Sequence, residues 1–147
     1  MDLSFLKWPI IIGVIALVGW LASSGGVNYM YKKFTASQPG VNAQTDAVDE
    51  SGLSRLGGYC LMLFKYDKAM MVYETAVSRY PDGKNVWYNK YQMARCADKL
   101  SDYRKEVNIL RELMDANAHS IDDRVPVNDN LRLRAEKLVE MHELEKR

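Results

Sequence analysis

The sequence predicts an all-α protein in which an N-terminal transmembrane helix precedes a solenoid of short helical hairpins closed by a C-terminal capping helix. Three observations lead to this prediction. Residues 8–27 carry no charged side chain, residues 53–81 alternate small and large apolar residues at helical offsets, and residues 128–142 place apolar side chains on one helix face. We expect a membrane anchor over residues 1–34, a flexible tether over 35–49 and a helical domain over 50–147.

Length, composition and charge narrow the class of protein. The 147 residues suffice for one modest domain and an anchor, and an apolar share of 48% excludes disorder throughout. Twenty basic and nineteen acidic side chains give a formal net charge of +1, so we expect no nucleic-acid partner. Cys60 and Cys96 fall in predicted helices. Helices stacked about 8–10 Å apart seldom permit a disulfide, so two free thiols are expected.

The predicted transmembrane helix, about residues 8–27, matches a bilayer in length. At about 1.5 Å rise per residue it would cross a hydrocarbon core about 30 Å thick. Trp8 at one end and Tyr29 at the other are typical of the membrane interface. A signal peptide cleaved after Ser24 is the alternative interpretation, although its N-terminal region has few basic residues. Lysines flank both ends evenly, so the side of the membrane that holds the helical domain stays open.

Small and polar residues from 35 to 46 predict the flexible tether. At about 5–6 Å times the square root of its length, such a segment lets the domain move roughly 20 Å from its anchor. Asp49 and Glu50 follow without a histidine or a third ligand nearby, so we interpret them as acids in the first turn of a helix.

Residues 53–81 have the spacing of two antiparallel helices that approach closely. Gly57 on the first helix and Ala69 and Ala76 on the second have almost no side chain, so large neighbours such as Tyr73 can fill the space between them. A bulky residue at position 57 should overpack the pair, at a cost of about 1–3 kcal/mol.

This stretch resembles the tetratricopeptide repeat, whose pattern is W-x2-L-G-x2-Y, A-x3-F, A and P. The matching residues are Leu53-x2-Leu56-Gly57-x2-Cys60, Ala69-x3-Tyr73-x2-Ala76 and Pro81. Leu53 stands in place of the usual Trp and Cys60 in place of the usual Tyr, and both are residues of buried type. A generic helical hairpin is the alternative. The resemblance implies stacked two-helix repeats that bind proteins.

A second copy begins near Trp87, because the turns between helices match at an offset of 37 residues. Tyr66 then corresponds to Tyr103, whereas Glu106 falls where the first copy has Ala69. The family period is 34, so we expect the first helix of this copy to be extended by nearly a turn.

The last predicted helix would cap the stack. Asn128 or Asp129 is the expected N-cap, and Leu131, Ala135 and Leu138 recur on one face. A terminal element that is apolar inside and polar outside is what a solenoid requires.

The sequence carries no catalytic, cofactor or metal motif. His119 lies in a polar connection and His142 on the last helix, and neither has the spacing of a zinc site, so both are expected to face solvent. Phosphate-binding glycine motifs and the G-x-S-x-G nucleophile motif are absent. We therefore expect no enzymatic activity, no cofactor and no bound metal.

The resemblance also implies a groove for partners, formed by equivalent positions of both copies. Its apolar first half and its charged, aromatic second half would suit an extended or helical peptide. The alternative is that Leu61 and Met62 only contact the tether or the closing helix. The expected groove residues are Gly58, Leu61, Met62, Tyr88, Tyr91, Arg95, Asp98 and Lys99, beside Ser51 and Ser54.

We expect a single-pass, membrane-anchored adaptor or accessory subunit that supports a larger complex at the membrane. Its partners would be a protein or peptide segment and, through the N-terminal helix, the lipid bilayer. The alternative is a protein-translocation accessory or chaperone-like receptor for extended peptide segments. Stacks of this kind usually need about three repeats, so self-association could complete the core.

Overall fold

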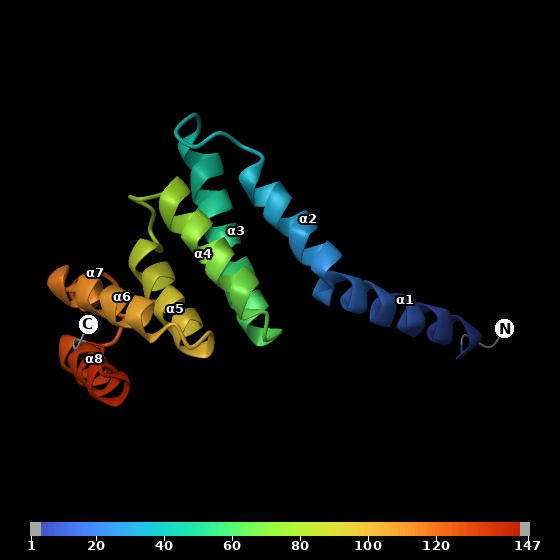
Figure 1. Ribbon diagram of the computed structural model, residues 1–147. Coiled ribbons are helices and arrows are strands. Elements are labelled where there is room, and N and C mark those ends of the chain that lie inside the picture. Colours follow the sequence, from blue (N-terminus) through green and yellow to red (C-terminus); the bar gives the residue numbers. More distant parts are fainter. Residues whose placement is uncertain (1–3, 145–147) are drawn as a thin grey trace.

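The computed structural model describes residues 4–144, with side chains from Lys7 onward, and every regular element in this part is a helix. The predicted all-α class is therefore confirmed for these residues. The outer ends of the predicted anchor and domain, residues 1–3 and 145–147, lie outside the described part. The helices are α1 (Ser4–Ala22), α2 (Ser24–Thr35), α3 (Ala43–Met62), α4 (Tyr66–Arg79), α5 (Val86–Lys99), α6 (Tyr103–Asp115), α7 (Ala118–Ile121) and α8 (Asn128–His142). Figure 1 shows α1 projecting alone from a stack formed by the others.

The α3–α4 pair is the predicted hairpin, and its close packing depends on Gly57. A Cβ at Gly57 would lie 2.6 Å from ring carbons of Tyr73, so only glycine leaves room for the ring. Tyr73 is fully buried there, as are Ala69 and Ala76 on the same helix. At Gly58 the nearest atom would be 3.6 Å away, which is an ordinary contact.

The α5–α6 pair repeats the α3–α4 turn at the predicted offset of 37 residues. Phe64 and Ser101 take equivalent left-handed conformations, with φ of 57° and 59°. The residues that follow, Lys65 and Asp102, share a φ of −91° and a ψ of 67°. Each donates its backbone N–H to the carbonyl five residues earlier, at 2.9 Å in both turns. The helix ends are therefore closed in the same way.

The period of 37 residues exceeds the family period of 34, and the extra residues lie in the connection between α4 and α5. They do not extend the first helix of the second copy. α5 has 14 residues and α3 has 20, so the prediction of an extended α5 is wrong. The connection over residues 80–85 is held by Glu50, which is 3% exposed. The Glu50 carboxylate accepts the backbone N–H of Asn85 at 2.6 Å and its side-chain amide at 2.9 Å.

The tether predicted over residues 35–49 is shorter in the structure, because α3 begins at Ala43. Asn42 caps this helix by accepting two backbone N–H groups. Asp49 and Glu50 therefore lie inside α3 and are buried, so the first-turn role predicted for them is wrong.

The helix predicted over residues 8–27 is not continuous, because it breaks at Ser23 and bends by 67° between α1 and α2. At the bend, a Cβ on Gly26 would lie 2.5 Å from the carbonyl oxygen of Trp20, so glycine permits this close approach. By length and composition, no single helix in residues 7–144 could cross a bilayer, whereas α1 and α2 could do so only as a bent pair.

Beyond the bend, α2 packs on the first hairpin. The ring of Phe34 occupies the space that a side chain on Gly52 of α3 would need, and Val27 is 1% exposed. The Tyr31 hydroxyl is hydrogen-bonded to the Thr75 hydroxyl of α4 at 3.0 Å. These contacts make α2 part of the helical stack.

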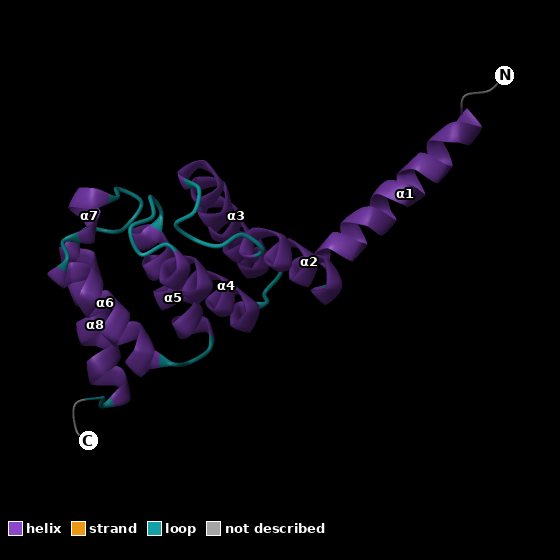
Figure 2. Cartoon of the chain, turned by 90° about the horizontal axis from the view of Figure 1, so that it is seen from above, coloured by secondary structure: helices purple, strands orange, loops and turns teal. Residues whose placement is uncertain are grey.

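At the other end, α8 covers α6 with the predicted apolar face. Leu131, Ala135 and Leu138 are buried in a core shared with α6. Val127 is the residue before the helix, so the N-cap predicted at Asn128 or Asp129 is wrong. Figure 2 shows α6 and α8 side by side at the end of the stack away from α1.

Candidate partner-binding cleft

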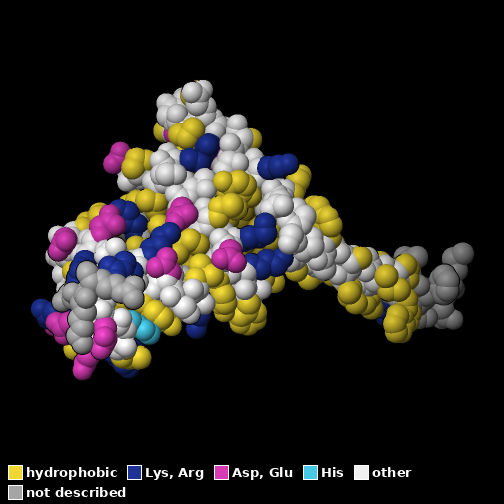
Figure 3. All heavy atoms as spheres, in the orientation of Figure 1, with side chains coloured by type: hydrophobic (Ala, Val, Ile, Leu, Met, Phe, Trp, Pro, Cys, Tyr) yellow, Lys and Arg dark blue, Asp and Glu magenta, His cyan; other side chains and the backbone are white. Residues whose placement is uncertain are grey.

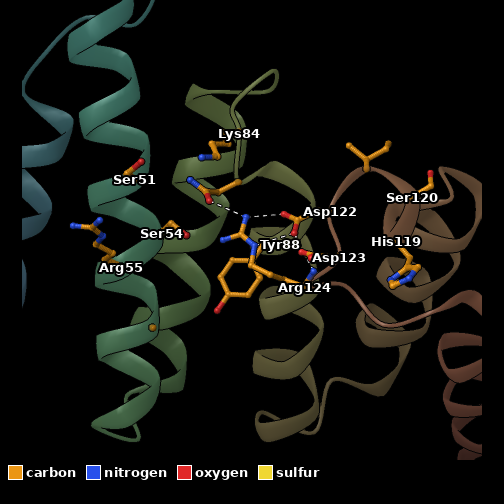
Figure 4. A pocket seen from close by; sticks show the side chains of 13 residues that line it. Ser51, Ser54, Arg55, Lys84, Tyr88, His119, Ser120, Asp122, Asp123 and Arg124 are labelled. Atoms are coloured by element: carbon orange, nitrogen blue, oxygen red, sulfur yellow. Dashed lines mark hydrogen bonds and ion pairs between the residues drawn. The ribbon is translucent and has the colours of Figure 1, made fainter.

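A cleft of about 840 Å³ lies between α3, α5 and the segment that includes α7. It contains part of the predicted groove, namely Gly58 and Tyr88, together with Ser51 and Ser54 (Figure 4). The remaining residues that line it come from connections and α7: Lys84, Asn85, His119, Ser120, Ile121, Asp122, Asp123 and Arg124, with Arg55 of α3.

Arg124 occupies the centre of the cleft and is held on several sides. Its guanidinium donates to the Asp122 carboxylate at 2.9 and 2.7 Å and to the Asn85 side-chain oxygen at 2.9 Å. The same group lies 4.3 Å from the centroid of the Tyr88 ring, a cation–π contact visible in Figure 4. Hydrogen bonds from Arg124 lower the pKa of the Asp122 carboxyl and raise the pKa of Arg124. This arrangement fixes a planar cation in the cleft.

Two further cationic side chains at the cleft make no polar contact, within the described part of the chain, that would stabilise the fold. Arg55 and Lys84 are exposed, and neither has a hydrogen-bond or ion-pair partner among the described residues. With Arg124 they give three positive charges against Asp122 and Asp123, so one positive charge is in excess. The cleft can therefore accept a carboxylate or another anionic group.

An apolar hollow of about 600 Å³ adjoins this cleft between α2 and α3. Ser51 and Arg55 line both, so Arg55 stands at the boundary between an apolar and a cationic surface. The apolar residues of the hollow are Met30, Phe34, Ala47, Val48, Leu56 and Tyr59.

Three residues from the second half of the predicted groove lie apart from the cleft, next to α8. Tyr91, Arg95 and Asp98 line a recess of about 310 Å³ beside α6 and α8. Asp98 is paired with Arg134 of α8 at 2.6 Å, and Arg134 also binds the buried Glu106 at 2.9 Å. The recess and the cleft share no lining residue.

The other predicted groove residues lie outside the cleft, the hollow and the recess. Leu61 is half-buried, Lys99 is exposed, and Met62 is 77% exposed, so neither the tether nor α8 covers Met62. Sequence reasoning missed Arg55 on α3, and it missed Lys84 and Arg124, which come from connections without periodicity. The one available signal was the period of 37, because its extra residues form the connection that carries Lys84.

Other titratable side chains serve the fold. His119 is half-buried, with Nδ1 2.7 Å from the Val125 carbonyl oxygen, so the solvent-exposed position predicted for it is wrong. His142 is exposed and stacks on Tyr103 at 3.7 Å between ring centroids. Cys60 is a free, buried thiol. Among the described residues no group of three or more His, Cys, Asp or Glu side chains could hold a metal ion.

No family model, no curated protein and no solved structure matches this chain. The geometry of the cleft and the exposed apolar α1 therefore remain as the indications of function.

Proposed function

We propose that this protein is a membrane-anchored adaptor or accessory subunit, similar to tetratricopeptide proteins, that holds a segment of a partner protein in the cleft between α3 and α5. The observation that carries the proposal is the pair of uncommitted cations, Arg55 and Lys84, at the edge of a cleft that adjoins an apolar hollow. Exposed cations of this kind contribute little to stability, whereas they are available to an acidic ligand.

The chemistry of the two surfaces defines the segment that would bind. Apolar side chains would enter the hollow between α2 and α3, and an acidic residue or a C-terminal carboxylate would lie near Arg55 and Lys84. Ser51 and Ser54 line the cleft between these positions, and the Ser54 hydroxyl already donates to Asn89 at 2.7 Å. A peptide with neighbouring apolar and acidic residues satisfies both surfaces.

The membrane part of the proposal rests on α1. Its large apolar side chains are exposed from Trp8 to Trp20, with Ile10, Ile15 and Leu17 each more than half accessible. A contiguous exposed apolar surface marks a membrane or protein contact, and the composition of α1 suits lipid.

The test is co-purification from native membranes in mild detergent, followed by quantitative mass spectrometry. Reversal of both charges in Arg55→Glu/Lys84→Glu removes the two proposed ion pairs to the acidic partner segment and adds repulsion, so partner recovery should fall about tenfold. Lys99→Glu is the matched control, because Lys99 is an exposed lysine outside the cleft. Equal recovery with the double variant and the control would refute the cleft as the partner site.

The alternative, a translocation accessory or chaperone-like receptor, is less compatible with the positive charge of the cleft, which would repel a basic segment. Targeting segments are basic, and the cleft has an excess of positive charge. Sizing of the detergent extract separates the two functions: an accessory subunit should elute in one large complex, and a receptor for passing segments should elute mostly free.

A further inference from the structure

We propose that the turn between α3 and α4 is a second membrane contact, which places Met62 and Phe64 in the headgroup region beside α1 and thereby orients the helical stack on the bilayer. This inference rests on the membrane anchoring by α1 proposed above. It adds a lipid-binding role for residues 62–65.

The position of the turn is fixed at the end of α1. The Lys65 ammonium donates to the Ala22 carbonyl, the last residue of α1, at 2.8 Å. The Lys68 ammonium donates to the Asn28 side chain of α2 at 3.0 Å. If α1 is in lipid, this turn lies at the level where α1 leaves it.

The turn exposes two large apolar side chains. Met62 and Phe64 are each 77% exposed. Phe64 is left-handed with a φ of 57°, a conformation that costs a bulky residue about 1–2 kcal/mol and that glycine would adopt freely. Its ring makes an edge contact with Tyr66, with 6.4 Å between centroids. Figure 3 shows hydrophobic side chains along α1 and again at the end of the stack where Figure 1 places this turn.

The matching turn of the second hairpin shows that the fold does not require these residues. At the offset of 37, Lys99 takes the place of Met62 and Ser101 takes the place of Phe64, with the same backbone conformation and hydrogen bonds. The polar version lies in the turn of the next hairpin, which has no such hydrogen bonds to α1. The apolar version lies where the stack joins α1. The apolar residues of this turn are therefore explained by its position beside α1, since the same fold forms with polar residues.

Charge and aromatic residues favour lipid as the occupant over a protein surface. Lys65 and Lys68 follow the apolar pair with Asp67 between them, and the remaining single positive charge attracts anionic headgroups. Next to the turn, the Trp20 and Tyr29 rings lie 5.9 Å apart across the α1–α2 bend, and such residues are typical of the membrane interface.

The experiment uses the full chain in vesicles of phosphatidylcholine and phosphatidylserine. A polarity-sensitive fluorophore is attached through Met62→Cys, which keeps Phe64, or through the matched Lys99→Cys. The native thiols are free but fully buried, so they do not compete for the label. Nitroxide groups on the lipid acyl chains should quench the label at 62 and leave the label at 99 unaffected, because an interfacial apolar group sits about 5–10 Å into the membrane boundary.

Adding Phe64→Ser, which installs the residue of the matching turn, should reduce the quenching at 62 several-fold without unfolding. Equal quenching at 62 and 99 would overturn the contact. If vesicle flotation shows the chain bound while the label at 62 is not quenched, the contact fails and the anchor stands. If the chain does not float, both fail. If the emission of the fluorophore at position 62 shifts to the blue with protein concentration and not with lipid, the turn contacts a second copy of the chain. That result would also overturn the proposal.

Discussion

Alanine at position 57 tests the packing that orders the first hairpin, and Gly58→Ala is its matched control. The new methyl group at 57 would lie 2.6 Å from ring carbons of the fully buried Tyr73, whereas at 58 its nearest neighbour would be 3.6 Å away. Both changes gain about 1 kcal/mol of helix propensity, so this contribution cancels between them. Overpacking at 57 costs about 1–3 kcal/mol, and Gly57→Ala should be less stable than Gly58→Ala by that amount.

The measurement is thermal unfolding of the full chain in detergent, followed by far-ultraviolet circular dichroism. A difference of about 1–3 kcal/mol corresponds to melting temperatures roughly 4–12 °C apart in a chain of this size. Equal melting temperatures, or a higher one for Gly57→Ala, would show that the Tyr73 ring can move and would refute the steric argument.

Three further predictions concern buried titratable groups. Glu50→Ala leaves the Asn85 N–H without its acceptor and should cost about 1–3 kcal/mol in urea unfolding; an unchanged midpoint would contradict this. Hydrogen bonds from Arg124 hold the pKa of Asp122 below 3.8, so its stabilising contribution is present above that pH and disappears as the pH falls through the lowered pKa. Asp122→Asn should therefore flatten the decline of melting temperature below about pH 4, and parallel curves would refute it. Burial raises the pKa of Cys96 to about 11, so its alkylation near neutral pH should be as slow as unfolding, and rapid labelling of the native protein would exclude this burial.

The first hairpin was predictable because its determinants are local. Gly57 and Tyr73 fall on two adjacent helices, and steric fit between small and large residues can be read from their spacing. The end of α1 was not predictable in this way. Serine and glycine near residue 23 are compatible with a continuous apolar helix, and the break is stabilised by Lys65, more than forty residues further along the chain.

The cleft follows the same rule. Gly58 and Tyr88 could be assigned to the cleft from their positions in the repeat, because helical periodicity determines which face of the helix each residue occupies. Lys84 and Arg124 could not, since their connections are placed by the bonds of Asn85 to Glu50 and to Arg124. Such long-range pairs leave no periodic signal. The ion pair of Asp98 with Arg134 of α8 is a further example.

Two hairpins are few for a stable stack, and α2 explains how this chain manages with two. It covers the open side of the first hairpin as α8 covers the second, with Val27 1% exposed and Phe34 packed over Gly52. A chain beginning at Ser24 should therefore melt close to the full chain, whereas one beginning at Ala36 loses the buried Val27, worth about 1.5–3 kcal/mol, together with the partly buried Phe34. A loss of about 1.5–3 kcal/mol or more is a substantial part of the stability of a typical domain. Equal melting of the two truncated chains would mean that α2 is an extension of the anchor and that the hairpins are stable without a cap.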